Sequence, residues 1–124
     1  MRYMFDANTI INLFSGAFPK LIARVAATEV GEIGISSIAF AEVALGSENG
    51  KPPEPTLLQG LIEQIPVLPF DEAAARTYAL LPFKRGNFDR LIAAHALSLS
   101  LTVISRNAKD FADVPGLRVE NWTV

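Results

Sequence analysis

The stretch "YMFDANTII", residues 3–11, places one carboxylate, Asp6, inside a run that is otherwise typical of a buried strand leading into a buried helix. Residues 2–5 predict a short strand, and residues 7–14 predict a helix that stops near Gly16. Asp6 therefore ends the strand at a βα turn. A helix N-cap is the simplest interpretation of an Asp in this place. Whether Asp6 also has a functional role depends on the other polar residues of the sequence.

Composition indicates one compact domain. The chain has 124 residues, 50% of them hydrophobic and 19% charged, and we expect a single domain over 1–124. It has no cysteine, which excludes disulfides, thiolate metal sites and a Cys nucleophile. The N-terminus lacks a secretory pattern, and no apolar run reaches the ~18 residues of a membrane span. We therefore expect a cytoplasmic protein that does not enter membranes.

Short apolar segments alternate with helical ones along the whole chain. Besides residues 2–5 we predict extended segments at 32–35, 66–70, 101–105 and 116–122. We predict helices at 19–28, 37–47, 56–65, 72–81 and 88–99, and a surface loop over 46–55. Ser36, Ser37 and Asp71 are candidate N-caps. This order predicts an α/β sandwich with a central, mostly parallel sheet of four to five strands.

Two further acids stand in apolar surroundings. Glu42 interrupts "IAFAEVAL", a helical segment that is apolar on every side, and Asp89 opens the helix "FDRLIAAHAL". A lone buried Glu is costly unless it is paired or binds a metal, so pairing with an Arg or exposure to solvent are the alternatives. Asp89 has the alternative of a first-turn acid favoured by the helix dipole. Asp6 belongs at the carboxyl edge of a parallel sheet, where ligands bind.

The segment "SRNAKDF", residues 105–111, returns to the same edge after another strand. Ser105 and Asn107 carry groups that bond water or phosphate, and Arg106 and Lys109 attract anions. Asp110 is either a fourth acid or the N-cap of a short turn, and we favour the N-cap.

Net charge is −2, so the surface as a whole would not attract nucleic acid. Something local would have to do so. The candidates are the cluster Lys84–Arg85 with Arg90 just beyond it, the trio Arg106, Lys109 and Arg118, or a bound cation. His95 does not share the face of Asp89 on its predicted helix, and we expect it to be structural.

Clustered carboxylates repel one another unless a cation joins them. A set of oxygen ligands without Cys suits Mg²⁺ or Mn²⁺. Such a site can activate water and hold a phosphodiester. Asp6, Glu42 and Asp89 are therefore the candidate metal-binding and catalytic residues.

The motifs resemble those of the PIN-domain ribonucleases, and specifically the VapC toxins of type II toxin–antitoxin systems. The matching segments run in order from Met4 to Trp122: "MFDANTII", "ISSIAFAEVALG", "VLPFDEAAARTYA", "FDRLIAAHALSLSLTVISRNAKDF" and "VPGLRVENW". The resemblance implies a single PIN domain, a PIN-like α/β/α sandwich, and Mg²⁺- or Mn²⁺-dependent cleavage of single-stranded or looped RNA.

Carried over by position, Asp6, Glu42 and Asp89 fall on the three principal acids of the family. Asn107 falls where many relatives have a fourth acid, which suggests a metal contact through water. Asn8 and Ser105 fall on small polar positions that would orient the metal's water.

The resemblance also implies partners and a substrate. A VapB-type antitoxin would cover the acidic groove and insert an Arg or Lys near the metal, and toxin homodimers within toxin–antitoxin hetero-oligomers are expected. Transfer RNA is the first expected substrate and ribosomal RNA the second.

Two other functions remain open at this point. A strand-end Asp is also the nucleophile of haloacid-dehalogenase-like phosphatases, but the second Asp expected two residues later is Asn8 here. A catalytically degenerate PIN-like module that only binds RNA or a partner is favoured by Asn107 in place of an acid.

Overall fold

A central parallel sheet organises the chain. The computed structural model describes residues 1–82 and 84–124. The five strands stand in the order β3-β2-β1-β4-β5, and every neighbouring pair is parallel. They are β1 (Tyr3–Phe5), β2 (Ile33–Ser36), β3 (Val67–Leu68), β4 (Thr102–Ile104) and β5 (Val119–Glu120). The predicted sheet is confirmed, with "PVLPF" supplying β3 at one edge and the last strand at the other.

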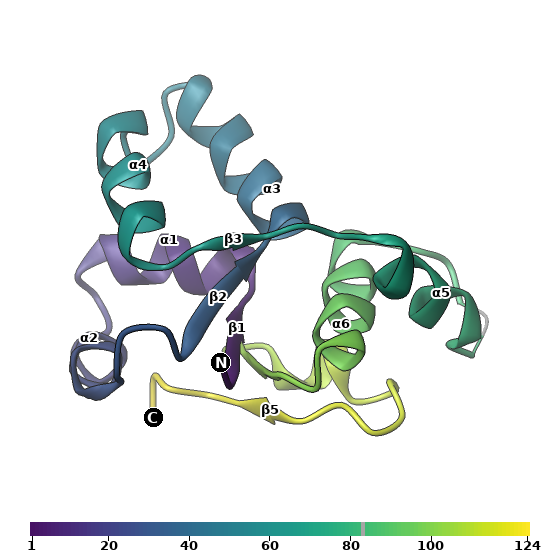
Figure 1. Cartoon of the computed structure of the whole chain (residues 1–124). Helices are drawn as coiled ribbons and strands as arrows, with labels where there is room; N and C mark the ends of the chain where they lie inside the picture. The colour runs from purple at the N-terminus through teal and green to yellow at the C-terminus, as the bar shows by residue number, and fades with distance from the viewer. Residues whose placement is uncertain (83) are drawn as a thin grey trace.

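Helices cover both sides of this sheet. They are α1 (Ala7–Ser15), α2 (Pro19–Ala27), α3 (Ser37–Glu48), α4 (Pro55–Gln64), α5 (Glu72–Leu80), α6 (Phe88–Ser98) and a short 3-10 helix, η1 (Ala108–Phe111). Figure 1 shows α1 and α2 on one side of the strands and α5 and α6 on the other. The chain therefore has the predicted α/β/α arrangement, in which crossover helices connect parallel strands.

Helix boundaries follow local capping, with two departures from the sequence prediction. Ser36 caps α3, its Oγ accepting a hydrogen bond from the N–H of Ile38 at 3.2 Å. Ser37 does not cap a helix: its Oγ accepts from the N–H of Phe70 at 3.0 Å and so joins α3 to the segment after β3. The predicted loop at 46–55 begins late, because α3 continues to Glu48.

The core lies on both faces of the central strand. Met4 and Phe5 are completely buried, and Trp122 packs edge-on against Tyr3 with ring centroids 4.9 Å apart. Each large apolar side chain contributes roughly 1.5–3 kcal/mol when it is fully buried. Gly34 leaves room for Leu68 of β3, since a Cβ at residue 34 would lie 2.6 Å from Cδ1 of Leu68 and the leucine side chain would have to move. The contact between Trp122 and Tyr3 brings the C-terminal segment directly against β1.

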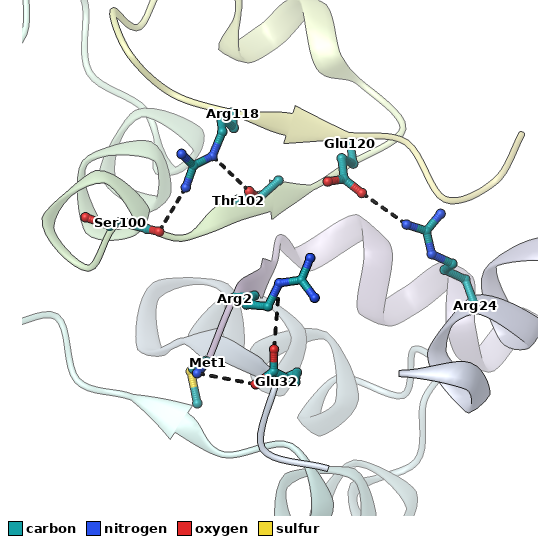
Figure 2. A network of polar contacts seen from close by, with 8 residues as sticks. All are labelled: Met1, Arg2, Arg24, Glu32, Ser100, Thr102, Arg118 and Glu120. Carbon is teal, nitrogen blue, oxygen red and sulfur yellow. Dashed lines mark hydrogen bonds and ion pairs between the residues drawn. The ribbon is translucent and has the colours of Figure 1, made fainter. Parts of the chain in front are cut away.

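Polar contacts hold the starts of the strands and the β5 edge together. Figure 2 shows this paired network, in which Glu32 meets the N-terminal amine of Met1 at 3.6 Å and Nε of Arg2 at 3.8 Å. Arg24 of α2 meets Glu120 of β5 at 3.3 Å. Each charge in these ion pairs has a partner of opposite sign, which is the arrangement expected of structural ion pairs.

Within the described residues, no helix is by itself long and apolar enough to cross a membrane, although α1 and α2 satisfy length and composition as a pair bent by 106°.

Candidate functional site

Asp6 combines a helix cap with a place at the carboxyl edge of the sheet. It is 3% exposed and caps α1, its Oδ1 accepting from the N–H of Thr9 at 2.8 Å. The cap that the sequence suggested is therefore part of its geometry. Because the cap uses one carboxylate oxygen, the second oxygen stays available as a ligand.

Thr9 is a positioning residue that the sequence did not reveal. Its Oγ1 donates to the carbonyl of Ile104 at 2.7 Å, which ties the first turn of α1 to the end of β4. The contact joins residues 95 positions apart, so no local pattern could predict it. It fixes the orientation of the turn that carries Asp6.

Glu42 projects from α3 toward the same edge. It is half-buried, and its Oε1 is buried with no hydrogen-bond partner among the described residues. Burial raises its pKa, and the charges of Asp89 and Asp6 raise it further. The alternative of pairing with an Arg is not found in the described part of the chain, where no ion pair includes Glu42. A buried carboxylate oxygen without a donor fits a site that receives a cation.

Asp89 lies half-buried in the first turn of α6. It does not cap the helix, because the side chain of Asn87 accepts from the N–H of Arg90 at 2.9 Å and fills that position. Burial raises the pKa of Asp89, and the charges of Asp6 and Asp110 add to the rise. The structure thus brings the three predicted acids within electrostatic range of one another.

Asp110 corrects a prediction. Asn107 occupies the N-cap position of η1, and Asp110 lies inside the turn with its N–H donating to the carbonyl of Asn107 at 2.9 Å. The charge of Asp110 raises the pKa of Asp89, so this residue belongs to the acidic surroundings. Asn107 itself is exposed, and its N–H donates to Oγ of the buried Ser105 at 3.0 Å. Ser105 therefore shapes the turn that presents Asn107.

A cleft of about 630 Å³ leads from Glu42 along α1 and α3. Asn8 and Glu42 line it, and Ile11 and Leu45 add apolar surface that is 39% and 68% exposed. The cleft joins the acidic edge to an apolar channel, as a peptide-binding groove would.

The predicted basic residues divide into two kinds. Arg85, Arg106 and Lys109 are exposed and stay candidates for binding RNA. The prediction for Arg90 is wrong, because this side chain is only 7% exposed. Its Nη1 meets Oδ2 of Asp113 at 3.1 Å, and its Nη2 donates to the carbonyl of Pro82. Arg90 therefore holds the segment before α6 in place.

Asp113 completes this attachment through a second cation. Nζ of Lys84 lies 2.7 Å from Oδ2 of Asp113, and the hydrogen bond from Lys84 lowers the pKa of Asp113.

His95 was expected to be structural: its Nδ1 lies 2.8 Å from Oγ of Ser36, and its ring packs edge-on against Phe70. Burial lowers the pKa of His95, which favours the neutral imidazole.

The donor set fits a hard divalent cation. It consists of oxygen ligands, and Glu42 contributes a buried oxygen that lacks a donor. In the part of the chain that the structure describes, no three His, Cys, Asp or Glu side chains are close enough to share one ion as they stand. The charges of Asp6 and Asp89 raise the pKa of Glu42, and the charge of Asp6 raises that of Asp89, so a cation placed between these acids would offset their repulsion.

Sequence and structure comparisons define the class. Residues 3–117 match the PIN domain family, and the chain belongs to it. Its curated relatives include the tRNA(fMet)-specific endonucleases VapC of Salmonella typhimurium, 33% identical over 98% of both chains, and Shigella flexneri, 30% identical over 99% of both.

The solved structures to which the chain is similar include two toxin–antitoxin complexes. Against DNA-bound VapBC from Salmonella typhimurium the TM-score is 0.87, with 29% identity and 98% of each chain covered. Against VapBC-1 from nontypeable Haemophilus influenzae it is 0.83, with 28% identity and 100% of each chain covered. The predicted fold and family are therefore confirmed.

Proposed function

We propose that this chain is the toxin of a VapBC-type toxin–antitoxin system, an endoribonuclease that hydrolyses RNA phosphodiesters with Mg²⁺ or Mn²⁺, and that residues 1–124 form one PIN domain. The main support for the metal site is Oε1 of Glu42, which is buried, has no hydrogen-bond partner among the described residues, and lies within electrostatic range of two further acids. Asp6, Glu42 and Asp89 would hold the ion. When bound, the metal lowers the pKa of a water and neutralises the approaching phosphate.

The chain's own residues prepare this site in distinct ways. Thr9 fixes the turn of Asp6 through Ile104, and Asn87 caps α6 and so fixes the first helical turn, which carries Asp89. Asn8 and Asn107 are exposed amides beside the acids, and we assign them to orienting water or phosphate. Asn107 would act through water, since an amide binds a metal more weakly than a carboxylate.

For the substrate we propose RNA with an unpaired region, transfer RNA first and ribosomal RNA second. The names of the Salmonella and Shigella relatives, which specify a transfer RNA, support this order. Arg85, Arg106 and Lys109 are the exposed cations that would meet its backbone.

For the partner we propose a VapB-type antitoxin, in agreement with the VapBC complexes to which the chain is similar. The cleft between α1 and α3 offers it the exposed side chains of Ile11 and Leu45, and Glu42 would receive an Arg or Lys of the antitoxin. We further propose toxin homodimers within a hetero-oligomer, and a cytoplasmic location.

The decisive experiment compares the wild-type chain with Asp6→Asn, sequencing 5′-monophosphate RNA ends from cells that express each one. The proposal expects defined ends that depend on Asp6, and matching cleavage by the purified protein with Mg²⁺. Identical RNA profiles for both proteins would contradict catalysis. Products with 2′,3′-cyclic phosphates would contradict the metal–water scheme.

A degenerate PIN-like module is the second candidate, favoured by Asn107 in place of an acid. Titration calorimetry with Mg²⁺ and Mn²⁺ separates the two, since a catalytic site gives binding heat that Glu42→Gln loses. The phosphatase alternative has lost its support, because the chain belongs to the PIN domain family.

A further inference from the structure

The guanidinium of Arg106, just after β4, lies over an aromatic ring. Its guanidinium carbon is 4.7 Å from the centroid of Phe18. Phe18 is half-buried at the N-cap of α2, whereas Arg106 is exposed just after β4. A guanidinium held on a ring has one face covered and keeps the other face and its N–H groups for a ligand.

Among the described residues, two other arginines contact rings, and each of them is paired with a glutamate. Arg2 lies 4.9 Å from the ring of Tyr3 and pairs with Glu32, and Arg24 lies 4.8 Å from the ring of Trp122 and pairs with Glu120. Within residues 1–82 and 84–124, Arg106 takes part in no ion pair. No acid among these residues therefore neutralises the charge of Arg106.

Both residues of this pair follow elements that also contribute to the acidic edge. In the sequence, Arg106 lies between the buried Ser105 and Asn107. The N–H of Asn107 donates to Oγ of Ser105, and this hydrogen bond shapes the turn at the end of β4. Phe18 follows α1, the helix that Asp6 caps. The stack therefore bridges the segment after the C-terminus of α1 and the turn after β4, one helix length, roughly 13 Å, from the end of α1 that Asp6 caps.

We propose that Phe18 and Arg106 form a stacking subsite for one unpaired nucleobase of the RNA that is cut, an inference that rests on the proposed ribonuclease function. Bases splayed out of single strands stack on aromatic rings and on guanidinium planes. The same guanidinium donates to phosphate oxygens, which offsets the repulsion between RNA and the surrounding acids.

The subsite explains selection of looped RNA in physical terms. A base inside a duplex is already stacked on both faces, so placing it on Arg106 costs the unstacking energy, whereas a loop base pays little. Phe18 and Arg106 thus act as positioning residues and touch no reacting atom.

Steady-state cleavage of a hairpin RNA cut by the wild-type protein tests this subsite. Arg106→Lys keeps the charge without the plane, and Phe18→Leu keeps apolar volume without the ring. Loss of one stacked base corresponds to a rise in KM of roughly 5- to 150-fold, with kcat within about twofold. Phe18→Tyr is the matched control and should retain the wild-type KM. Equal melting temperatures for all four proteins show that folding is unchanged.

An abasic series identifies the stacked nucleotide. One loop position should raise KM for the wild-type protein when its base is removed, and Arg106→Lys should add nothing further at that position. Wild-type KM values for both Arg106→Lys and Arg106→Ala would overturn the subsite, as would an abasic effect that is additive with Arg106→Lys at every position.

Binding separates this proposal from the ribonuclease function. In the Asp6→Asn background, a hairpin RNA with 2-aminopurine in its loop should be quenched on binding, and Arg106→Lys should remove the quenching. Arg106→Ala should also lower the salt slope by about one, whereas Arg106→Lys should not. Quenching that survives both substitutions would overturn the subsite even if RNA is cut. Absence of Asp6-dependent cleavage, with quenching intact and dependent on Arg106, would overturn only the catalytic function.

Discussion

The starts of the strands and the carboxyl edge of the sheet differ in how charge is balanced. At the starts of β1 and β2, Glu32 meets the N-terminal amine of Met1 at 3.6 Å and Nε of Arg2 at 3.8 Å (Figure 2). At the carboxyl edge the acids face one another, burial and mutual repulsion raise the pKa values of Glu42 and Asp89, and Oε1 of Glu42 has no donor. The first arrangement stabilises the fold, and the second costs free energy that only a ligand recovers.

The largest expected effect separates Glu42 from Glu32, two acids at opposite ends. Glu42→Gln removes a proposed metal ligand, so cleavage should fall by more than the ~10- to 100-fold that loss of an outer partner costs. Glu32→Gln breaks only the contacts with Met1 and Arg2 and should leave the rate within about twofold. Initial cleavage rates at saturating Mg²⁺ measure both. Equal rates for the two variants would remove the functional distinction between the ends.

A second effect is metal-linked stability. On the proposed function, Mg²⁺ binds the carboxyl edge of the folded chain and not the unfolded chain, so at 100 times its dissociation constant it should raise the free energy of unfolding by about 2.7 kcal/mol. Asp89→Asn should abolish this gain, and Glu32→Gln should keep it. Urea unfolding with Mg²⁺ and with EDTA measures the difference, and a gain retained by Asp89→Asn would place the ion elsewhere.

A third effect concerns the attachment of α6. Arg90→Ala removes a buried side chain with its hydrogen bond to the carbonyl of Pro82, and should cost roughly 2 kcal/mol of unfolding free energy. The exposed Arg85→Ala should change the unfolding free energy by less than about 0.5 kcal/mol. Chemical denaturation compares them. If Arg90→Ala instead lost RNA binding with unchanged stability, the prediction from sequence that Arg90 binds RNA would be correct.

The smallest effect is the pH dependence of metal-free stability. The pKa of folded Glu42 is raised above its ordinary value of 4.5, so the folded state holds this proton more tightly than the unfolded state. Its penalty is absent below pH 4.5 and grows as pH rises through the raised pKa. Relative to Glu42→Gln, the wild-type protein with EDTA should therefore lose stability across that window. A difference that stays constant with pH would contradict the raised pKa.

The sequence predicted those parts of the molecule that local pattern encodes. Asp6 and Glu42 stood out because polar residues in apolar segments need a reason, and parallel topology placed Asp6 at the right edge. Arg90 was misjudged because its burial depends on Asp113, which lies 23 positions away. Thr9 escaped notice for the same reason, since its partner is the carbonyl of residue 104.

The central position of β1 has a consequence for synthesis on the ribosome. β1 pairs with β2 on one side, but its other neighbour, β4, begins at Thr102, and Trp122 packs against Tyr3 still later. At ~5–20 residues per second, roughly 5–20 s separate translation of β1 from translation of β4. During that interval the edge that carries Asp6 lacks its neighbour and the anchor that Ile104 gives to Thr9. The edge that carries Asp6 is therefore completed only after β4 has been made.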